Sequence, residues 1–277
     1  MRIWVNDRLV DEADAVVSVL DHGLTVGDGV FETVKVLGGT PFALTRHLRR
    51  LAGSALGLGL PAPSDSAIRS AIASVLDANS YGELGRLRIT YTGGVSPLGS
   101  ERGTNGPTLV IAVVPMAQPP ATTPVVTVPW PRNEHSALAG LKTTSYAENV
   151  LALARARSAG ATEALASNTA GELCEGTGSN IFVVLDGQVA TPPLASGCLA
   201  GVTRDLLLEW TDAMELTVPM SALTEAAEIF LTSTTRDVQG VSAVDGRAVL
   251  ADPEVPGPLT AKLRATFLSR AREQLDP

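Results

Sequence analysis

A proline-rich stretch over residues 116–124 divides the chain into two parts with separate secondary-structure patterns. Three of its nine residues are proline, which interrupts both helices and the middle of a sheet. We therefore expect a small domain over residues 1–118, a linker over 119–124 and a larger domain over 125–277. The length of 277 residues suits two domains, since one domain typically holds about 100–150 residues.

The part before this stretch has the pattern of short strands joined by tight turns, together with two helices. The glycines of Gly27-Asp28-Gly29 predict a turn into an apolar strand, and Thr45 and Ser64 stand where helix N-caps are expected. The expected elements are a hairpin over 1–11, strands over 30–37, 84–92 and 107–115, and helices over 46–58 and 65–78.

The part after it also mixes strands with helices. Ser145 and Glu148 match the capping-box pattern, which predicts a helix from there to about Ser158. The other expected elements are strands over 162–167, 180–185, 188–191, 216–218 and 228–232, and helices over 203–213 and 257–273. Such a mixture in two unequal parts indicates the α/β or α+β class.

Composition limits the partners and the compartment. The chain has 21 basic and 29 acidic residues, a net charge of −8, which disfavours nucleic acid and anionic membrane surfaces as partners. Cys174 and Cys198 are too few for a disulfide framework, and no Cys or His residues have metal-ligand spacing. No apolar run approaches the ~20 residues that cross a bilayer. We therefore expect a cytoplasmic protein without a metal.

Lysine is scarce, because only Lys35, Lys142 and Lys262 stand among the 21 basic residues. Most lysines are solvated surface residues. Lys142, however, lies between the apolar run 137–141 and the hydroxyl-bearing residues that follow it, with no other charge close in sequence. Such flanks favour a desolvated amine, and the neutral amine is the form that makes a Schiff base. Lys142 is therefore the candidate nucleophile.

Three further clusters suit a ligand with a ring and a phosphate, although each also fits an ordinary turn or cap. Glu175 is followed by glycines that let the backbone approach a planar ligand. Residues 199–204 open a helix, whose free N–H groups bind anions, and residues 232–235 are all Ser or Thr. A nucleophilic lysine, an acid for a ring nitrogen and phosphate sites are together what pyridoxal phosphate (PLP) requires.

These motifs, in this order, resemble the fold-type IV PLP-dependent enzymes, also called class IV aminotransferases. That family includes branched-chain aminotransferases, D-amino-acid aminotransferases and 4-amino-4-deoxychorismate lyases. The resemblance covers essentially the whole chain, including the spacing from Lys142 to Glu175. It rests on the motifs Gly27–Thr33, His47–Leu51, Leu141–Thr143, Glu175–Phe182 and Gly201–Arg204.

The resemblance implies a role for each matching residue. Lys142 would form the Schiff base with PLP and then move protons, while Glu175 would bind the pyridine nitrogen and keep it protonated. The other implied cofactor contacts are Arg50, Val202, Thr203 and Thr234 at the phosphate, Gly178 and Leu199 at the ring faces, and Tyr146. The resemblance also implies a small N-terminal α+β domain, a larger mixed α/β domain with the cofactor between them, and a homodimer.

The motifs leave the reaction less constrained than the cofactor. The length and the Phe31-Glu32-Thr33 sequence look more like the lyase and D-amino-acid branches, but Gly93-Gly94 stands where the latter carries a carboxylate-binding arginine. We therefore expect a 4-amino-4-deoxychorismate lyase of folate biosynthesis, which yields 4-aminobenzoate and pyruvate. Phe31 would line the substrate side, with Arg88 and Arg102 as candidates for binding the substrate carboxylate.

Two alternatives stay open. One is a transaminase of branched-chain or other small amino acids with a 2-oxo acid acceptor. The other is a non-catalytic, PLP-binding member of the fold, which the presence of both Lys142 and Glu175 disfavours.

Overall fold

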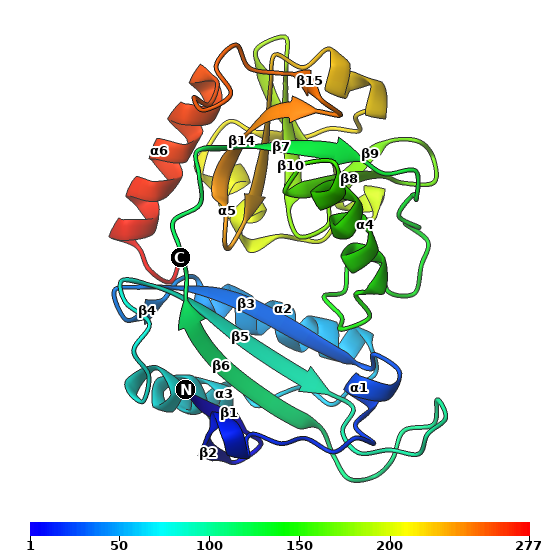
Figure 1. Ribbon diagram of the computed structural model, residues 1–277, viewed down its shortest axis with the longest axis vertical. Helices are drawn as coiled ribbons and strands as arrows, with labels where there is room; N and C mark the ends of the chain where they lie inside the picture. The colour runs from blue at the N-terminus through cyan, green and yellow to red at the C-terminus, as the bar shows by residue number, and fades with distance from the viewer. The chain divides into compact units, whose positions relative to one another are not determined.

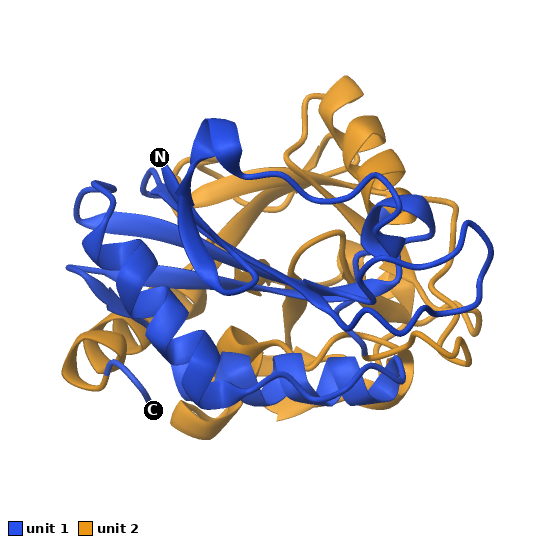
Figure 2. Cartoon of the chain, turned by 90° about the horizontal axis from the view of Figure 1, so that it is seen from below, with its two compact units in different colours: residues 1–118, 141–146, 275–277 blue, residues 119–140, 147–274 orange.

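The computed structural model describes all 277 residues, and the chain forms two compact units (Figure 2). Unit 1 comprises residues 1–118, 141–146 and 275–277, and unit 2 comprises residues 119–140 and 147–274. The segment that carries Lys142 therefore belongs to unit 1, although we expected it in the larger, C-terminal domain. The reason is backbone hydrogen bonding, described below, which ties this segment to a strand of unit 1.

Unit 1 is built on a six-stranded antiparallel sheet with the strand order β2-β1-β6-β5-β3-β4 (Figure 1). Its strands are β1 (Arg2–Val5), β2 (Arg8–Asp11), β3 (Gly29–Leu37), β4 (Thr40–Pro41), β5 (Leu84–Thr92) and β6 (Thr108–Pro115). Its helices are α1 (His22–Thr25), α2 (Leu44–Gly57) and α3 (Asp65–Asp77). The elements expected from the sequence in this part of the chain are therefore present, with small shifts at their ends.

Strand β3 presents different chemistry on its two faces, because successive side chains of a strand point to opposite sides of the sheet. Val30, Val34 and Val36 belong to the buried core that the sheet forms with α2 and α3. Glu32 shares their side of the strand, whereas Phe31 points to the other side. The alternation of β3 thus separates the two neighbours Phe31 and Glu32.

The two helix caps expected in unit 1 have different outcomes. Ser64 caps α3 as expected, since its side chain accepts a hydrogen bond from the Ala67 N–H. Thr45 does not cap α2, which begins one residue earlier, at Leu44, after Ala43 in a left-handed conformation with φ of 53°. The Thr45 hydroxyl instead donates to Asp276, 231 residues away in sequence. A short-range pattern could not reveal that partner.

The segment 141–146 lies along the start of β3. The Phe31 N–H donates to the Lys142 carbonyl at 3.0 Å, and the Thr144 N–H donates to the Gly29 carbonyl at 2.8 Å. Val30 and Thr143 form an antiparallel bridge between these two bonds. The Ser145 hydroxyl donates to the Gly27 carbonyl, and the next helix begins only at Ala147, so the capping box expected at Ser145 was wrong.

Unit 2 is built on a nine-stranded mixed sheet, in which eight strands follow the order β12-β11-β10-β13-β14-β7-β8-β9 and β15 pairs with β14. The strands are β7 (Thr122–Thr127), β8 (Glu163–Ser167), β9 (Leu173–Gly176), β10 (Asn180–Leu185), β11 (Gln188–Thr191), β12 (Met214–Glu215), β13 (Glu228–Ser233), β14 (Asp237–Val244) and β15 (Arg247–Ala248). The helices are α4 (Ala147–Ser158), α5 (Val202–Trp210) and α6 (Pro258–Glu273). No helix of the chain is long and apolar enough to span a membrane.

Unit 2 corrects three expectations. The second half of the expected 119–124 linker lies in β7, where Pro124 is tolerated because the pairing with β14 shifts register opposite it. The strand expected over 216–218 lies earlier, at β12. Strands β7, β9, β14 and β15 were not expected. Strand β14 contains Asp, Gln, Gly and Ser residues, which lower its apparent strand propensity.

Candidate active site

Lys142 is fixed in unit 1 through its backbone. Its N–H donates to the Ser54 hydroxyl of α2 at 3.2 Å, and its carbonyl accepts from Phe31 of β3. The amine nitrogen Nζ lies 4.3 Å from the centre of the Phe31 ring. A helix and a strand thus hold the main chain of Lys142, while its side chain stays partly exposed.

Several of the expected site residues of unit 1 lie around the Phe31 ring. The ring is buried, and the guanidinium carbon of Arg88 lies 3.4 Å from its centre. The Tyr146 ring meets it edge-on, with centroids 5.3 Å apart. Unit 1 therefore brings Phe31, Arg88, Lys142 and Tyr146 together.

Arg88 is a cation without an ion-pair partner. Its hydrogen bonds to the hydroxyls of Thr33 and Thr90 are long, at 3.5 Å each. Desolvation lowers the pKa of Arg88 to about 10, which still leaves the guanidinium charged at neutral pH. This arrangement suits an anionic group of a ligand better than it suits a structural ion pair.

Arg102, in contrast to Arg88, forms an ion pair within unit 1. It donates to both carboxylate oxygens of Asp28, at 2.7 and 2.6 Å, and to the carbonyls of Leu58 and Gly59. The hydrogen bond from Arg102 holds the pKa of Asp28 below its usual value. Arg102 therefore joins three segments of unit 1, and we no longer propose it as a carboxylate-binding residue, because four of its five N–H donors already have partners.

Arg50 lies in the middle of α2, where a buried carboxylate anchors it. Its Nε and Nη2 donate to the two oxygens of Glu32 at 2.7 and 2.8 Å, and His47 Nδ1 lies 2.7 Å from Glu32 Oε2. Burial alone would raise the pKa of Glu32, but Arg50 and His47 outweigh it and hold that pKa well below its usual range. Burial in turn lowers the pKa of His47. Glu32 is thus ionised and fully buried.

Glu175 is a buried acid of unit 2, as Glu32 is of unit 1. It lies in β9, where its Oε1 is 3.2 Å from Arg132 Nη2 and its Oε2 accepts from the Leu199 N–H at 3.0 Å. The Leu199 carbonyl in turn accepts from the Asn180 amide at 2.8 Å. Unit 2 thus brings Glu175 and Leu199 together.

The start of α5 offers an anion site. Its N-cap is Gly201, which has no side chain to bond the free N–H groups of Val202 and Thr203. A Cβ on Gly201 would lie only 1.9 Å from Asn180 Oδ1, so glycine is needed here. The Thr232 hydroxyl is buried without a hydrogen-bond partner, and its direct pairing with Asn180 places both side chains on one face of the sheet. Thr234 lies in the turn that follows β13.

The turn after Glu175 is held by a second buried acid. Glu163 accepts from the Thr177 N–H at 2.9 Å, from the Thr177 hydroxyl, and from the Ser179 hydroxyl at 2.9 Å. A Cβ on Gly178 would meet no atom of the chain within 4 Å. The open space above Gly178 therefore suits the face of a planar ligand.

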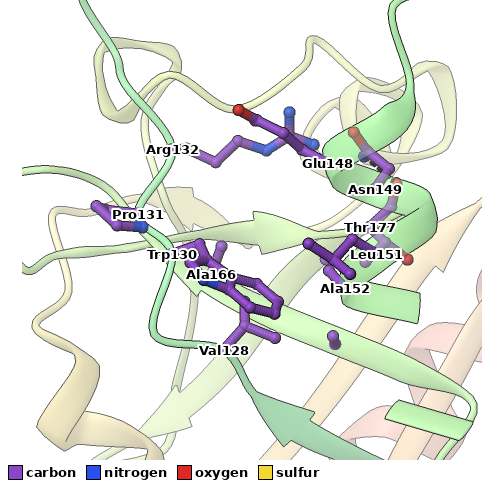
Figure 3. Close-up of a pocket in the computed structure, with 12 residues that line it drawn as sticks. Val128, Trp130, Pro131, Arg132, Glu148, Asn149, Leu151, Ala152, Ala166 and Thr177 are labelled. Carbon is purple, nitrogen blue, oxygen red and sulfur yellow. Dashed lines mark hydrogen bonds between the residues drawn. The ribbon is translucent and has the colours of Figure 1, made fainter. Parts of the chain in front are cut away.

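A pocket of about 270 Å³ lies in unit 2 beside this turn (Figure 3). Its apolar wall includes Val128, Trp130 and Ala152, and its polar rim includes Arg132 and Glu148. Arg132, the ion-pair partner of Glu175, thus also lines this pocket.

The donors of both units fit the parts of PLP. Unit 1 offers an amine on a fixed backbone and an arginine anchored by Glu32. Unit 2 offers a buried carboxylate, an uncapped helix start and an unpaired hydroxyl. The fold and the residues that each unit offers agree with the class of fold-type IV, PLP-dependent enzymes that the sequence resembles.

Comparison with known proteins supports that class. Residues 29–244 match the family described as amino-transferase class IV. The chain is 35% identical to a putative branched-chain-amino-acid aminotransferase of Methanocaldococcus jannaschii, over 96% of this chain and 95% of the relative. It is 28% identical to a D-alanine aminotransferase of Bacillus licheniformis, over 96% of each chain.

A solved structure gives the same result. The branched-chain aminotransferase of the thermophilic archaeon Thermoproteus uzoniensis, solved with norvaline, matches with a TM-score of 0.86 and 30% identity, over 97% of this chain and 93% of that one. Another branched-chain amino acid aminotransferase that matches, with a TM-score of 0.89, was solved with pyridoxamine 5'-phosphate. The chain therefore belongs to the class IV aminotransferase family and is a PLP-dependent enzyme of the kind that catalyses transamination. These relatives favour transamination over the lyase reaction that the sequence analysis placed first.

Sequence reasoning missed several residues around the site. No short-range signal pointed to Arg132 as the partner of Glu175, or to Ser54 as the acceptor for the Lys142 N–H. The spacing of His47 and Arg50, three residues apart on one helix, could have indicated that both face the same partner. That partner, Glu32, stood inside a motif that we quoted without giving it a role.

Proposed function

We propose that this enzyme is a transaminase that moves the amino group of a branched-chain or other small aliphatic amino acid to a 2-oxo acid. The observation that carries the proposal is the placement of Lys142, whose amine lies over the Phe31 ring, the ring that the guanidinium of Arg88 also contacts. An amine held there can take a proton from a substrate α-carbon and return it.

The cofactor contacts are proposed residue by residue. Lys142 would hold PLP covalently, Glu175 would bond its ring nitrogen, and Gly178, Leu199 and Tyr146 would contact the ring. Arg50, Val202, Thr203 and Thr234 would bind the phosphate. When bound, PLP withdraws electrons from the substrate α-carbon, most strongly with a protonated ring nitrogen.

Two features of this chain would shape the ring's surroundings. Arg132 and the Leu199 N–H each bond one oxygen of Glu175 and so fix the carboxylate plane. Both bonds favour the ionised carboxylate, which is the form that keeps a proton on a neighbouring nitrogen.

The substrate would be recognised by charge and by apolar contact. Arg88 would bind a carboxylate of the amino acid or of the 2-oxo acid, since its guanidinium has only two long hydrogen bonds within unit 1. Phe31 would pack against the aliphatic part of the substrate. The 35% identity to a putative branched-chain-amino-acid aminotransferase supports an aliphatic substrate.

A substrate panel tests the reaction. The purified enzyme is incubated with L-leucine, L-valine, D-alanine or D-glutamate, each with an excess of a 2-oxo acid, and new amino and oxo acids are quantified. A separate reaction contains 4-amino-4-deoxychorismate without any 2-oxo acid. Transfer from the branched-chain L-amino acids supports the proposal. Release of 4-aminobenzoate and pyruvate, with no transfer in the other reactions, would overturn it in favour of the lyase.

We also propose a homodimer, which the family resemblance supports. Light scattering coupled to size-exclusion chromatography tests it, and a mass of one chain would contradict it.

A further inference from the structure

Glu32 is a fully buried carboxylate in a place where apolar side chains form the core. It lies on the helix-facing side of β3, between Val30 and Val34, which belong to the hydrophobic core of unit 1. Burying an ionised carboxylate is costly unless every oxygen is hydrogen-bonded. A fold that needed only packing here would place a valine at this position. Packing of the core therefore does not explain why a charged Glu32 stands at this position.

The hydrogen bonds around Glu32 converge on one side chain of the candidate site. Arg50 Nε and Nη2 bond the two oxygens of Glu32 in parallel, which fixes the plane of the guanidinium. His47 Nδ1 bonds the same Oε2 as Arg50 Nη2 and so holds the carboxylate from a second direction. His47 and Arg50 lie three residues apart in α2, so helix and strand together set where the guanidinium lies.

We infer that Glu32 and His47 are positioning residues for phosphate recognition: they hold Arg50 in one orientation, so that its guanidinium is directed to the cofactor's phosphate. The inference rests on the proposed function, which assigns Arg50 to that phosphate. It goes further by making a buried carboxylate necessary for binding an anion, although the carboxylate itself repels one.

Two opposing effects make the inference testable. Removing the negative charge of Glu32 reduces electrostatic repulsion of the phosphate, which alone would strengthen binding. Removing it also releases Arg50, which alone would weaken binding. In Glu32→Gln, the amide NH₂ must face a donor in either orientation, because Arg50 donates to both oxygen positions. The bidentate pair is therefore lost, and we expect its loss to outweigh the reduced repulsion.

The experiment compares two ligands that differ only in the phosphate. Dissociation constants of the full-length chain, stripped of cofactor, are measured for PLP and for pyridoxal by absorbance titration. In Glu32→Gln we expect the Kd for PLP to rise about tenfold, or about 1.4 kcal/mol, while the Kd for pyridoxal changes less than about twofold. A rise that is equal for both ligands, or tighter binding of PLP, would overturn the inference.

A second pair of variants tests His47 without changing the charge of Glu32. In His47→Asn the amide nitrogen can occupy the position of Nδ1, whereas His47→Leu has no donor. We expect the PLP-specific loss in His47→Leu and its rescue in His47→Asn. Equal affinities in these two variants would contradict the role of His47, and this pair decides the question if Glu32→Gln does not fold.

Two controls separate this inference from the proposed function. Arg50→Leu should weaken PLP but not pyridoxal; if it weakens neither or both equally, the assignment of Arg50 to the phosphate fails. If Arg50→Leu behaves as expected and Glu32→Gln does not, only the positioning inference fails. Glu228→Gln changes another buried carboxylate, one that accepts from the first N–H groups of α6 in unit 2, and it should alter neither affinity.

Discussion

The first prediction concerns Asp276, which caps helix α2 from the other end of the chain. The Thr45 N–H donates to Asp276 Oδ1 at 2.8 Å, and the Thr45 hydroxyl donates to Oδ2 at 2.6 Å. Ala43, which precedes the helix, makes no side-chain cap. Asp276→Ala should therefore destabilise the first turn of α2, the helix that also carries His47 and Arg50.

The structure sets the size of this effect. Loss of an N-cap side chain typically costs about 1 kcal/mol, and loss of a carboxylate from a helix N-terminus costs about 0.3–1 kcal/mol more. Asp276 is exposed, so water partly replaces the lost bonds and the net effect is smaller than the sum of these two contributions. We expect Asp276→Ala to reduce the local free energy of opening by about 1 kcal/mol. Asp276→Asn keeps an acceptor and should lose less than half as much.

Hydrogen exchange measured by mass spectrometry suits this prediction, because a chain of two units need not unfold in one step. Peptides that cover the start of α2 should exchange about fivefold faster in Asp276→Ala, while peptides from α3 serve as the internal control. A Thr45→Val variant and the double variant complete a cycle. Unchanged exchange at α2 in Asp276→Ala would refute the capping role, and fully additive effects in the cycle would show that the Thr45 hydroxyl contributes nothing to it.

Four further predictions concern the site and the response to acid. Lys142→Ala should lower turnover at least about 10⁴-fold in the transamination assay, and turnover near the wild-type rate would contradict the role of Lys142. Glu175→Gln should retain PLP, measured by absorbance after gel filtration, but lower kcat on the order of 100-fold; an unchanged kcat would count against Glu175 as the ring-nitrogen partner. Arg88→Leu should raise KM for the amino acid or the 2-oxo acid about tenfold with a smaller change in kcat, and an unchanged KM for both substrates would remove Arg88 from substrate binding. Hydrogen bonds from the Thr169 N–H and hydroxyl lower the pKa of Glu134 to about 2, so Glu134 adds stability above its unfolded pKa near 4.5 and loses it as the pH falls toward 2. Thermal melts at pH 2–5 should therefore show a weaker pH dependence for Glu134→Gln than for the wild type, and parallel curves would contradict this.

Much of the fold followed from patterns within a few residues of each other. Alternating apolar residues placed β3, β5 and β6 within about one residue of their ends, and Ser64 marked the start of α3. Such features depend on local geometry, namely the two-residue period of a strand and the hydrogen bond from a cap to the N–H three residues on. They therefore appear in the sequence itself.

The expected caps at Thr45 and Ser145 were wrong for one physical reason. A hydroxyl near a helix start can donate to any acceptor that the fold brings close, and the nearest acceptors here are Asp276 and the Gly27 carbonyl. The strand expected over 216–218 and the unexpected β14 have a related cause. Strand formation depends on the neighbours that supply hydrogen bonds, and those neighbours lie far away in sequence.

The sequence alone determined the kind of chemistry, because Lys142, Glu175 and the glycines around them are residue types that few functions require in that order. Only the tertiary structure decided how the charged groups are paired. Arg88 and Arg102 are both arginines of unit 1 and were equal candidates, but Asp28 engages both nitrogens of the Arg102 fork, whereas Arg88 stacks on Phe31 without an ion pair. The structure likewise showed that the Glu32 carboxylate contacts His47 and Arg50, which the sequence did not indicate. Ion pairs form over distances of about 3–4 Å between segments that can be tens of residues apart in the sequence. The sequence therefore shows which residues are charged, but only the folded structure shows which of them form pairs.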